Sequence, residues 1–276
     1  MTAKRPFRST AYRYHSEIPI LVLTVLISVG VVFITALLTN YLSLILVAAI
    51  FIITFSSANA MQTNLMARAF LVQPSSAPAI AAVVESCYKR LRPGPLRVFV
   101  LREKIVNAYT FGLAGPKNIV LLEPMLAIMN PEELAFVIGH EMGHVALGHT
   151  WLNTFVGGLA GSPSPFGLNV IVFTVFQSWS RACELSCDRA GLLACGNLKY
   201  AISALLRLAA PNIQSEEDLQ KVLANIDQEE ETMIGQALET FQSHPLIFRR
   251  INELKAYAAT DEYRQLQQKM NANLDL

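Results

Sequence analysis

Two histidines and a glutamate form the clearest chemical pattern of the chain. The run His140-Glu141-Met142-Gly143-His144 has the His-Glu-x-x-His spacing. On a helix, residues four apart share a face, so both imidazoles can bind one Zn²⁺ while Glu141 faces the open coordination position. Zinc lowers the pKa of its water toward about 7, and the carboxylate takes that water's proton as it attacks a carbonyl. The pattern therefore predicts metal-assisted hydrolysis.

A hydrolytic zinc site needs a third protein ligand, and a carboxylate on a second helix can supply it. The metzincin alternative fails, because Leu147 and Thr150 stand where that pattern has Gly and His. Residues 184–188 (Glu-Leu-Ser-Cys-Asp) place two acids four apart, on one face of a helix. We expect Glu184 to bind zinc and Asp188 to hold a ligand histidine by its other ring N–H.

Both motifs also have a purely structural interpretation. The histidines could be satisfied polar groups of a core helix, and two acids at this spacing are often only a solvated helix face. The chain has no other Glu-x-x-x-Asp, however, and this one lies between apolar stretches, where an unpaired carboxylate is costly. The zinc interpretation is therefore favoured.

Helix signals surround the two motifs. Residues 130–133 (Asn-Pro-Glu-Glu) combine an Asn cap, a Pro at the first helical position and an acid three residues after the cap. They predict a helix that continues to about His149. A second helix is predicted from near Gln177 to Cys195, ended by Gly and Asn at 196–197.

The remaining elements suggest a small sheet among helices. Helices are predicted from about Ala77 to Leu91 and from Leu198 to Leu208. The acidic stretch Ser215–Phe241 predicts a solvated helical pair without chemistry. About three strands are expected, over Leu96–Leu101, Val106–Phe111 and Asn118–Leu122.

The composition indicates a membrane protein. Of 276 residues, 53% are hydrophobic and only 16% are charged, and the mean hydropathy is +0.37. Such a chain is too apolar for an ordinary soluble protein and excludes disorder as its main character. A net charge of +1 leaves no excess of basic residues, so nucleic-acid binding has no electrostatic basis.

The most apolar stretch lies near the amino terminus. Residues 18–67 contain no charged residue and no histidine. As one helix they would run roughly 75 Å, against about 30 Å for the hydrocarbon core of a bilayer. A break at 39–41 (Thr-Asn-Tyr) predicts two transmembrane helices, Ile18–Leu38 and Leu42–Phe55, with Ala60 as the alternative end of the second. A signal peptide is the alternative, but its apolar region is usually 7–15 residues.

Basic residues set the expected orientation. The leading tail has four basic residues, Lys4, Arg5, Arg8 and Arg13, and a single acid, Glu17. The positive-inside rule therefore predicts that this tail lies in the cytosol. Two crossings then return the remainder of the chain to the cytosolic side. Four cysteines without the spacing of a disulfide framework agree with a reducing compartment.

Three parts are therefore expected: a basic cytosolic tail at 1–17, two transmembrane helices within 18–60, and a zinc metallopeptidase domain at 61–276. Within the last part, residues 150–180 are apolar, and glycines and prolines divide them into pieces shorter than a bilayer core. They predict a membrane-associated hairpin that lies on the membrane or dips into it. Two extra crossings are the alternative.

Several segments together resemble the M48 family of membrane metallopeptidases, which includes the HtpX heat-shock proteases and the Ste24 CaaX-processing proteases. The resemblance covers roughly Ala77–Ala256, and the paired leading spans are HtpX-like. The seven-helix barrel of the Ste24 enzymes does not fit this length. The matching segments are 140–144, 148–149, 181–191, 243–245, 250–251, 106–109 and 119–121.

The resemblance implies further site residues. His244, followed six residues later by Arg250, would line the site and stabilise the oxyanion of the tetrahedral intermediate. Arg249 competes with Arg250 for this role, and His244 could instead cap a helix. Asn107 and Ala108 would lie on an edge strand that pairs with an extended peptide substrate.

Tyr109 follows on the same strand, where its hydroxyl could assist the reaction or its ring could simply pack. The expected fold class is α+β and mainly α: an N-terminal transmembrane helical hairpin followed by a gluzincin-type metalloprotease domain with a small β-sheet. The expected cofactor is one Zn²⁺ per chain, held by His140, His144 and Glu184, with Glu141 as general base.

The expected activity is endopeptidase cleavage of membrane-associated or misfolded proteins by an integral protein of a bacterial cytoplasmic membrane. Its partners are then protein or peptide substrates and the lipid bilayer, and the sequence sets no oligomeric state. Specific CaaX-type processing is an alternative, as is an idle membrane scaffold or chaperone-like protein that zinc stabilises. A transporter is disfavoured, because the leading spans lack charged residues.

Overall fold

The computed structural model describes residues 9–112, 115–151, 168–209, 217 and 246–272. In these residues the helices are η1 (Ser9–Tyr12), α1 (Glu17–Leu38), α2 (Leu42–Arg68), α3 (Pro78–Leu91), α4 (Glu123–Ile128), α5 (Pro131–Leu147), α7 (Leu168–Cys195), α8 (Leu198–Ala209), α11 (Leu246–Ala258) and α12 (Asp261–Ala272). The strands are β1 (Phe70–Leu71), β2 (Leu96–Leu101), β3 (Ala108–Phe111) and β4 (Lys117–Leu122).

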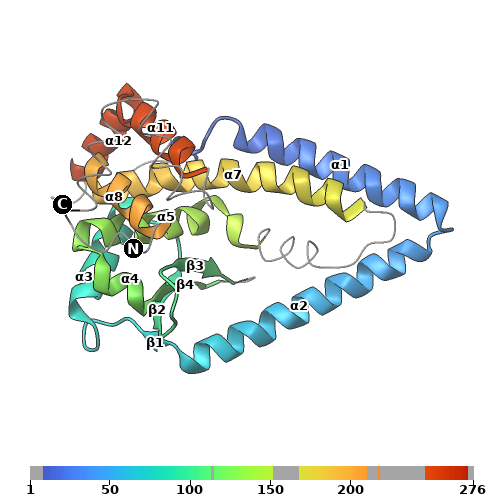
Figure 1. Ribbon diagram of the computed structural model, residues 1–276, viewed down its shortest axis with the longest axis horizontal. Coiled ribbons are helices and arrows are strands. Elements are labelled where there is room, and N and C mark those ends of the chain that lie inside the picture. Colours follow the sequence, from blue (N-terminus) through green and yellow to red (C-terminus); the bar gives the residue numbers. More distant parts are fainter. Residues whose placement is uncertain (1–8, 113–114, 152–167, 210–216, 218–245, 273–276) are drawn as a thin grey trace.

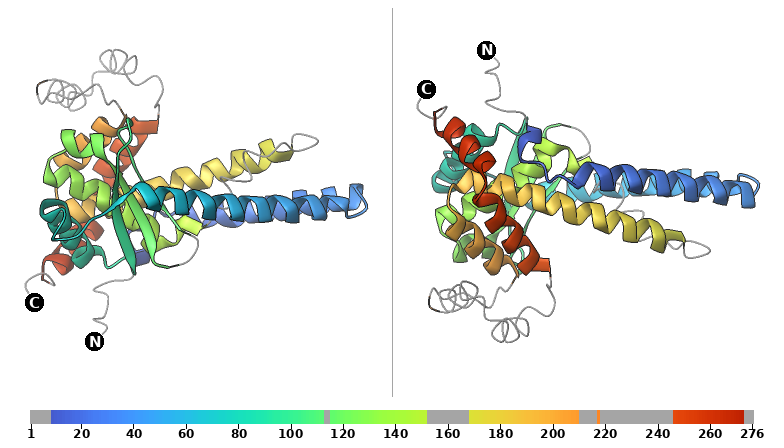
Figure 2. Two further views of the ribbon diagram at one scale, coloured as in Figure 1. Left: turned by 90° about the horizontal axis from the view of Figure 1, so that it is seen from below. Right: turned by 90° about the horizontal axis from the view of Figure 1, so that it is seen from above.

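Three long helices extend from one side of a body that holds the sheet and the other helices (Figure 1). Helices α1, α2 and the amino-terminal half of α7 all point away from this body, in the further views as well (Figure 2). Helices α1 and α7 pack against each other, and the hydroxyl of Thr24 lies 3.4 Å from the backbone oxygen of Val175. The helix that carries Glu184 and Asp188 thus packs directly against the apolar helix α1.

The break between α1 and α2 falls where the sequence predicts it. Asn40 and Tyr41 have φ of 47° and 66°, and the Tyr41 N–H donates to the Ala36 oxygen at 2.7 Å. Helix α1 is, within the described residues, the one helix long and apolar enough to cross a membrane. Helix α2 continues to Arg68, well past the expected end at Phe55 or Ala60, through a polar last third.

The sheet has four strands in the order β1-β2-β4-β3, one more than the expected three. Strands β2 and β4 are parallel and the other pairs antiparallel. Strand β3 begins at Ala108 rather than at Val106 and forms one edge of the sheet. Because side chains alternate between faces, Thr110 points toward α5 while Tyr109 packs on the other face.

Helix α5 begins with the predicted capping box. The Asn130 side chain accepts from the Glu133 N–H at 2.8 Å, and the Glu133 carboxylate accepts from the Asn130 N–H at 2.9 Å. The helix ends at Leu147, before the expected His149, because Gly148 adopts a left-handed conformation with φ of 80°. The Glu133 carboxylate also accepts from Arg207 on α8 at 3.1 Å, which ties α5 to its neighbour.

Helix α7 is longer than predicted, because it already includes Leu168, nine residues before Gln177. Its end at Cys195 matches the prediction. Residues 152–167 of the expected membrane-associated hairpin lie outside the described residues. So does the expected acidic helical pair at Ser215–Phe241, apart from residue 217.

The main hydrophobic core surrounds α5. This helix packs against α7, α3 and α8, and it also contacts the sheet. Fully or almost fully buried members of this core include Ile119, Leu121, Ile138, Met142, Leu192, Leu193 and Leu205. The helix with the His-Glu-x-x-His motif is therefore held from several sides.

Glycines allow α5 and α7 to approach closely. A Cβ atom at Gly139 would lie 2.3 Å from the Cβ of Ala194, and one at Gly191 would lie 2.7 Å from the Phe136 oxygen. A Cβ atom at Gly143 would lie 2.9 Å from the Cβ of Ala190, so this position also has no room for a side chain. These glycines set the distance between the two motif-bearing helices.

We therefore expect Gly139→Ala to destabilise the protein by about 1–3 kcal/mol, since overpacking outweighs the better helix propensity of Ala. For a domain of this size the midpoint of thermal unfolding should fall by several degrees. Gly30→Ala on α1 is the matched control, because a Cβ placed there meets no described atom within 4 Å apart from its own turn of the helix. Equal midpoints for both variants would contradict close packing at Gly139.

Candidate metal centre

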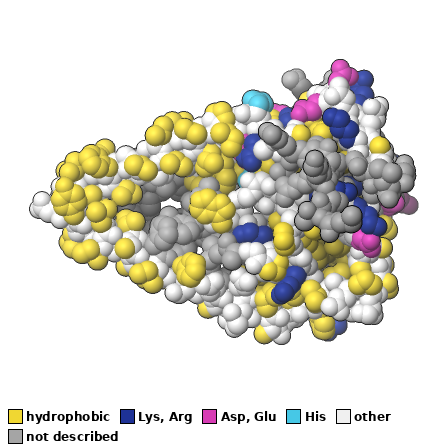
Figure 3. Space-filling view, turned by 180° about the vertical axis from the view of Figure 1, so that it is seen from behind, with side chains coloured by type: hydrophobic (Ala, Val, Ile, Leu, Met, Phe, Trp, Pro, Cys, Tyr) yellow, Lys and Arg dark blue, Asp and Glu magenta, His cyan; other side chains and the backbone are white. Residues whose placement is uncertain are grey.

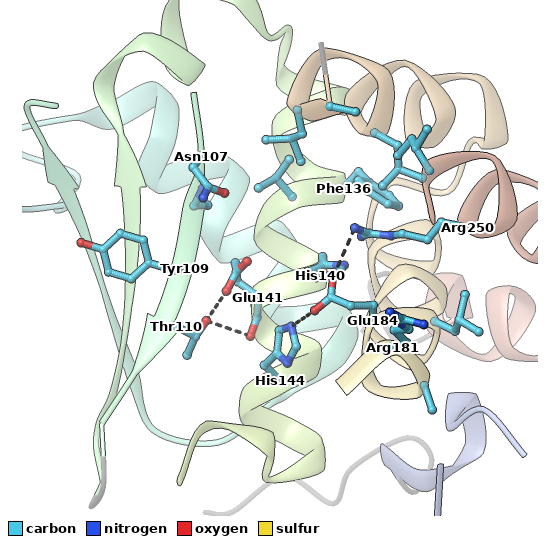
Figure 4. A pocket seen from close by; sticks show the side chains of 18 of the residues that line it. Asn107, Tyr109, Thr110, Phe136, His140, Glu141, His144, Arg181, Glu184 and Arg250 are labelled. Atoms are coloured by element: carbon cyan, nitrogen blue, oxygen red, sulfur yellow. Dashed lines mark hydrogen bonds and ion pairs between the residues drawn. The ribbon is translucent and has the colours of Figure 1, made fainter. Parts of the chain in front are cut away.

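His140 and His144 lie on one face of α5, toward α7, with ring centroids 5.0 Å apart. Each residue is 8% exposed. From α7, Glu184 places Oε2 at 3.4 Å from His140 Nε2 and Oε1 at 3.4 Å from His144 Nε2 (Figure 4). The structure thus brings the three predicted metal ligands together at one point.

Asp188 occupies the other side of His140. Its Oδ1 lies 3.0 Å from His140 Nδ1. Arg250 of α11 reaches the same carboxylate with two donors, Nη2 to Oδ1 at 2.6 Å and Nε to Oδ2 at 2.8 Å. Its Nη1 also lies 3.3 Å from Glu184 Oε2. Arg250 therefore binds both acids of α7.

The two acids and the arginine control the electrostatics of the site. Burial alone would lower the pKa of His140, but Glu184 and Asp188 raise this pKa to about 10. Burial alone would raise the pKa of Glu184, but Arg250 and His140 hold it well below its usual range. The site therefore keeps its carboxylates ionised and favours a positive charge beside the imidazoles.

These properties fit a bound metal cation. Two imidazole nitrogens and one carboxylate form a donor set typical of a hydrolytic zinc site. Each ring also has its Nδ1 engaged by another side chain, which leaves Nε2 directed at the shared point. Because a metal ligand must be deprotonated, binding would displace the proton that His140 otherwise holds.

Cys187 is the alternative to Glu184 as the third metal ligand. Its sulfur lies within 4.8 Å of ring nitrogens of both His140 and His144. The sulfur contacts His149 Nδ1 at 3.6 Å, on the Nδ1 side of His144. Burial raises the pKa of this thiol well above its ordinary value, which opposes the thiolate form that metals bind. Glu184 is the better candidate. All four cysteines are free.

Glu141 points from α5 toward the edge of the sheet (Figure 4). The Thr110 hydroxyl on β3 donates to its Oε2 at 2.5 Å and also lies 3.3 Å from its backbone oxygen. Strand β3 therefore fixes the direction of the predicted general base. Thr110 was not among the residues predicted from the sequence, although its alternation with Tyr109 along a strand was an available signal.

A cavity of about 760 Å³ lies over these groups, between β3, α5, α7 and α11. Its lining includes Asn107 and Ala108 as well as His140, Glu141 and Glu184. Within the described part of the chain, β3 has no strand on its outer side. An open strand edge thus borders the candidate metal centre.

The other predicted residues lie around this cavity in different ways. Tyr109 is among the lining residues, but its ring lies on the opposite side of β3 from Glu141 and packs near Phe111 (Figure 4). The Asn107 side chain accepts from the Ala108 N–H at 2.9 Å. His244 lies outside the described residues, and Arg249 lines the cavity near Arg250.

Two further buried groups, Glu17 and His149, were not predicted as site residues. His149 Nδ1 lies 3.2 Å from His144 Nδ1, and His149 Nε2 lies 3.1 Å from Glu17 Oε1. Burial lowers the pKa of His149, so its ring is neutral near pH 7. A second histidine five residues after His144 was a visible signal, but its partner is 132 positions away.

The model of peptidase family M48 matches residues 74–258, two thirds of the chain. The chain belongs to peptidase family M48. It is thus a metallopeptidase, and the matched region includes α5, α7 and all of α11, with His140, His144 and Glu184. No solved structure matches the chain significantly.

Named M48 relatives are similar over parts of their length. The plastoglobule-localized metallopeptidase 48 of Arabidopsis thaliana is 28% identical over 191 residues, 63% of this chain and 55% of that protein. A protease HtpX homolog of Syntrophotalea carbinolica is 27% identical over 216 residues, 65% of this chain and 76% of the relative. A CAAX prenyl protease 1 homolog of Dictyostelium discoideum is 45% identical over only 49 residues, 12% of its length. The chain thus spans about half of the Arabidopsis protein.

Proposed function

We propose that this M48 metallopeptidase is a membrane-anchored zinc endopeptidase whose metal is held by His140, His144 and Glu184. The observation that carries the proposal is the position of the Glu184 carboxylate, with one oxygen 3.4 Å from each histidine Nε2. The ligand atoms come from two helices fixed by close glycine packing, so the site is preorganised for a cation.

The chain's own groups suit peptide hydrolysis. When bound, zinc supplies Lewis-acid chemistry, lowering the pKa of water and polarising the scissile carbonyl. Glu141, held by Thr110, accepts the proton of the attacking water and passes it to the leaving amine. Asp188 orients the His140 ring through Nδ1. Arg250 keeps both acids of α7 ionised, and with His244 it is a candidate for stabilising the oxyanion.

The substrate is an extended peptide segment. Strand β3 offers its outer edge beside the cavity, so a substrate can pair through its backbone, as in β-strand addition. Asn107 and Ala108 lie at the start of this edge, while Tyr109 supports the strand from behind. Backbone pairing accepts many sequences, which suits membrane-associated or misfolded proteins as substrates.

The membrane contact is made by the projecting helices. Their outer surfaces carry large apolar side chains, which gather on the narrow end of the molecule (Figure 3). On α1, Leu26, Phe33 and Leu38 are 64%, 62% and 80% exposed. As a helix of 22 residues, α1 is about 33 Å long, enough for the hydrocarbon core. The basic tail then places the catalytic domain on the cytosolic side.

Helix α2 and the first part of α7 project from the body on the same side as α1 (Figure 1). The uncharged part of α7, residues 168–180, is about 20 Å long, which is less than the thickness of the hydrocarbon core. This stretch dips into the membrane beside α1 without crossing it by itself. The zinc site would thus lie just outside the bilayer surface.

Metal removal tests the proposal. The detergent-purified protein should contain one zinc ion per chain and cleave an unstructured protein. A chelator should abolish cleavage, and added zinc should restore it, because His140, His144 and Glu184 hold the ion reversibly. Cleavage that survives complete loss of metal would exclude the proposed mechanism. A metal-loaded protein that cleaves nothing would favour the idle scaffold instead.

A further inference from the structure

The two candidate ligand histidines are supported in parallel ways. His140 Nδ1 contacts the carboxylate of Asp188, which pairs with Arg250. Among the described residues, His144 Nδ1 contacts the ring of His149 rather than a carboxylate, and His149 Nε2 contacts Glu17. Glu17 in turn pairs with Arg13. Each ligand histidine is thus linked to a buried carboxylate that pairs with an arginine. His140 contacts its carboxylate directly, and His144 is linked to its carboxylate through His149.

When His144 binds metal, the ring protons of His144 and His149 have only one possible arrangement. With His144 Nε2 on the metal, Nδ1 carries the proton and donates to His149 Nδ1. His149 is then protonated at Nε2, which donates to Glu17 Oε1 at 3.1 Å. Every donor meets an acceptor, and His149 stays neutral.

The Glu17 carboxylate is built into the body of the protein although it opens α1. The residue is fully buried. Its second oxygen accepts from the Ser186 hydroxyl, which in turn accepts from the Tyr14 N–H at 2.8 Å. Ser186 lies between Glu184 and the other acid of α7. The carboxylate is therefore fixed relative to the ligand-bearing helix, and a surface anchor would need none of these contacts.

We propose that Glu17 is a positioning residue that fixes the metal ligand His144 through His149, so that the base of the first apolar helix is part of the metal centre. This inference rests on the zinc site proposed above. It gives α1 a role beyond anchoring, since the orientation of a metal ligand then depends on how the apolar helix is seated.

The same residues could be interpreted as a second metal site, because ligand atoms of Glu17, His149 and Cys183 lie within 4.8 Å of one another. Two observations oppose this interpretation. Both oxygens of Glu17 already accept hydrogen bonds, one from Arg13 and one from Ser186, and burial holds the pKa of the Cys183 thiol far above its ordinary value. A hydrogen-bonded relay instead needs only a neutral His149 ring and an ionised Glu17 carboxylate.

Zinc affinity of the full-length protein in detergent, measured by competition with a chelator, tests the proposal without relying on proteolysis. His149→Phe keeps an aromatic ring but removes the acceptor, and it should weaken zinc binding about 10–100-fold. His149→Asn offers an oxygen near the Nδ1 position and should restore much of this loss. Glu17→Gln should weaken binding less than His149→Phe does.

The double variant separates a relay from two independent structural effects. If Glu17 acts through His149, then Glu17→Gln should add nothing to the loss caused by His149→Phe, whereas independent effects would add. Trp179→Phe is the matched control, because Trp179 packs 5.8 Å from the His149 ring outside the relay. It should leave the zinc affinity close to the wild-type value even where it lowers stability.

Three results would overturn the proposal. The first is an unchanged zinc affinity in His149→Phe, and the second is full additivity in the double variant. The third is two zinc ions per wild-type chain with one lost in His149→Phe, which would assign a second metal site. A wild-type protein that binds no zinc would instead remove the proposed function itself, so the two failures are distinguishable.

Discussion

Glu141→Gln is expected to lower kcat about 10²–10⁴-fold while zinc content stays at one ion per chain. The amide cannot accept the proton of the attacking water, and general-base catalysis typically contributes a factor of this size. Thr110 can still donate to the amide oxygen of Gln, so the side chain should keep its direction. The KM for an unstructured protein substrate should change little, because the proposed backbone pairing with the edge of β3 does not involve the Glu141 carboxylate.

Single-turnover cleavage and metal analysis of the same sample measure this effect. Glu85→Gln on α3 is the control, since Glu85 is exposed and pairs only with the neighbouring Lys89 among described residues. Proteolysis at the wild-type rate in Glu141→Gln would remove Glu141 as the base. Loss of zinc from this variant would show that Glu141 acts in binding.

The second large effect is expected at Glu184, because Glu184→Gln replaces a charged ligand with a neutral amide. Loss of a group that only orients a ligand typically costs 10–100-fold in metal affinity, so loss of the ligand itself should cost more than about 100-fold. Proteolysis should fall in parallel at low zinc and recover in part at high zinc. Asp188 still pairs with Arg250 in this variant, which favours retention of the fold.

Cys187→Ala is the informative comparison for Glu184→Gln. Both side chains lie near the two histidines, and the carboxylate oxygens of Glu184 lie 3.4 Å from their Nε2 atoms. We expect Cys187→Ala to bind zinc like the wild-type protein. The opposite pattern, with loss of zinc in Cys187→Ala and retention in Glu184→Gln, would make the cysteine the third ligand.

The projecting helices give these site predictions a physical context. Helix α7 runs without interruption from beside α1 to Glu184 and Asp188. A rigid helix transmits tilt over its whole length, so the end of α7 beside α1 and the end with Glu184 move together. This connection and the contact of Glu17 with His149 both join the apolar helices to the site.

Local signals predicted the elements that carry chemistry. The Asn130 capping box set the start of α5, and Gly and Asn after Cys195 set the end of α7, since caps satisfy backbone groups within one turn. Boundaries set by tertiary contact were less accurate. Strand β1 was missed because two residues gain strand structure only by pairing with β2. Helix α7 extends further toward its amino terminus than predicted, and there Phe176 and Trp179 pack against Ile20 of α1.

The sequence by itself determined which residues can form a metallopeptidase site, because the spacing of His140, Glu141 and His144 on a helix follows from backbone geometry alone. It also marked the apolar helices, since hydropathy is a local property. Only the tertiary structure decided which groups surround these residues. Thr110, Glu17 and His149 reach the site through contacts between distant segments, and such contacts depend on how closely α5 and α7 pack rather than on any local pattern.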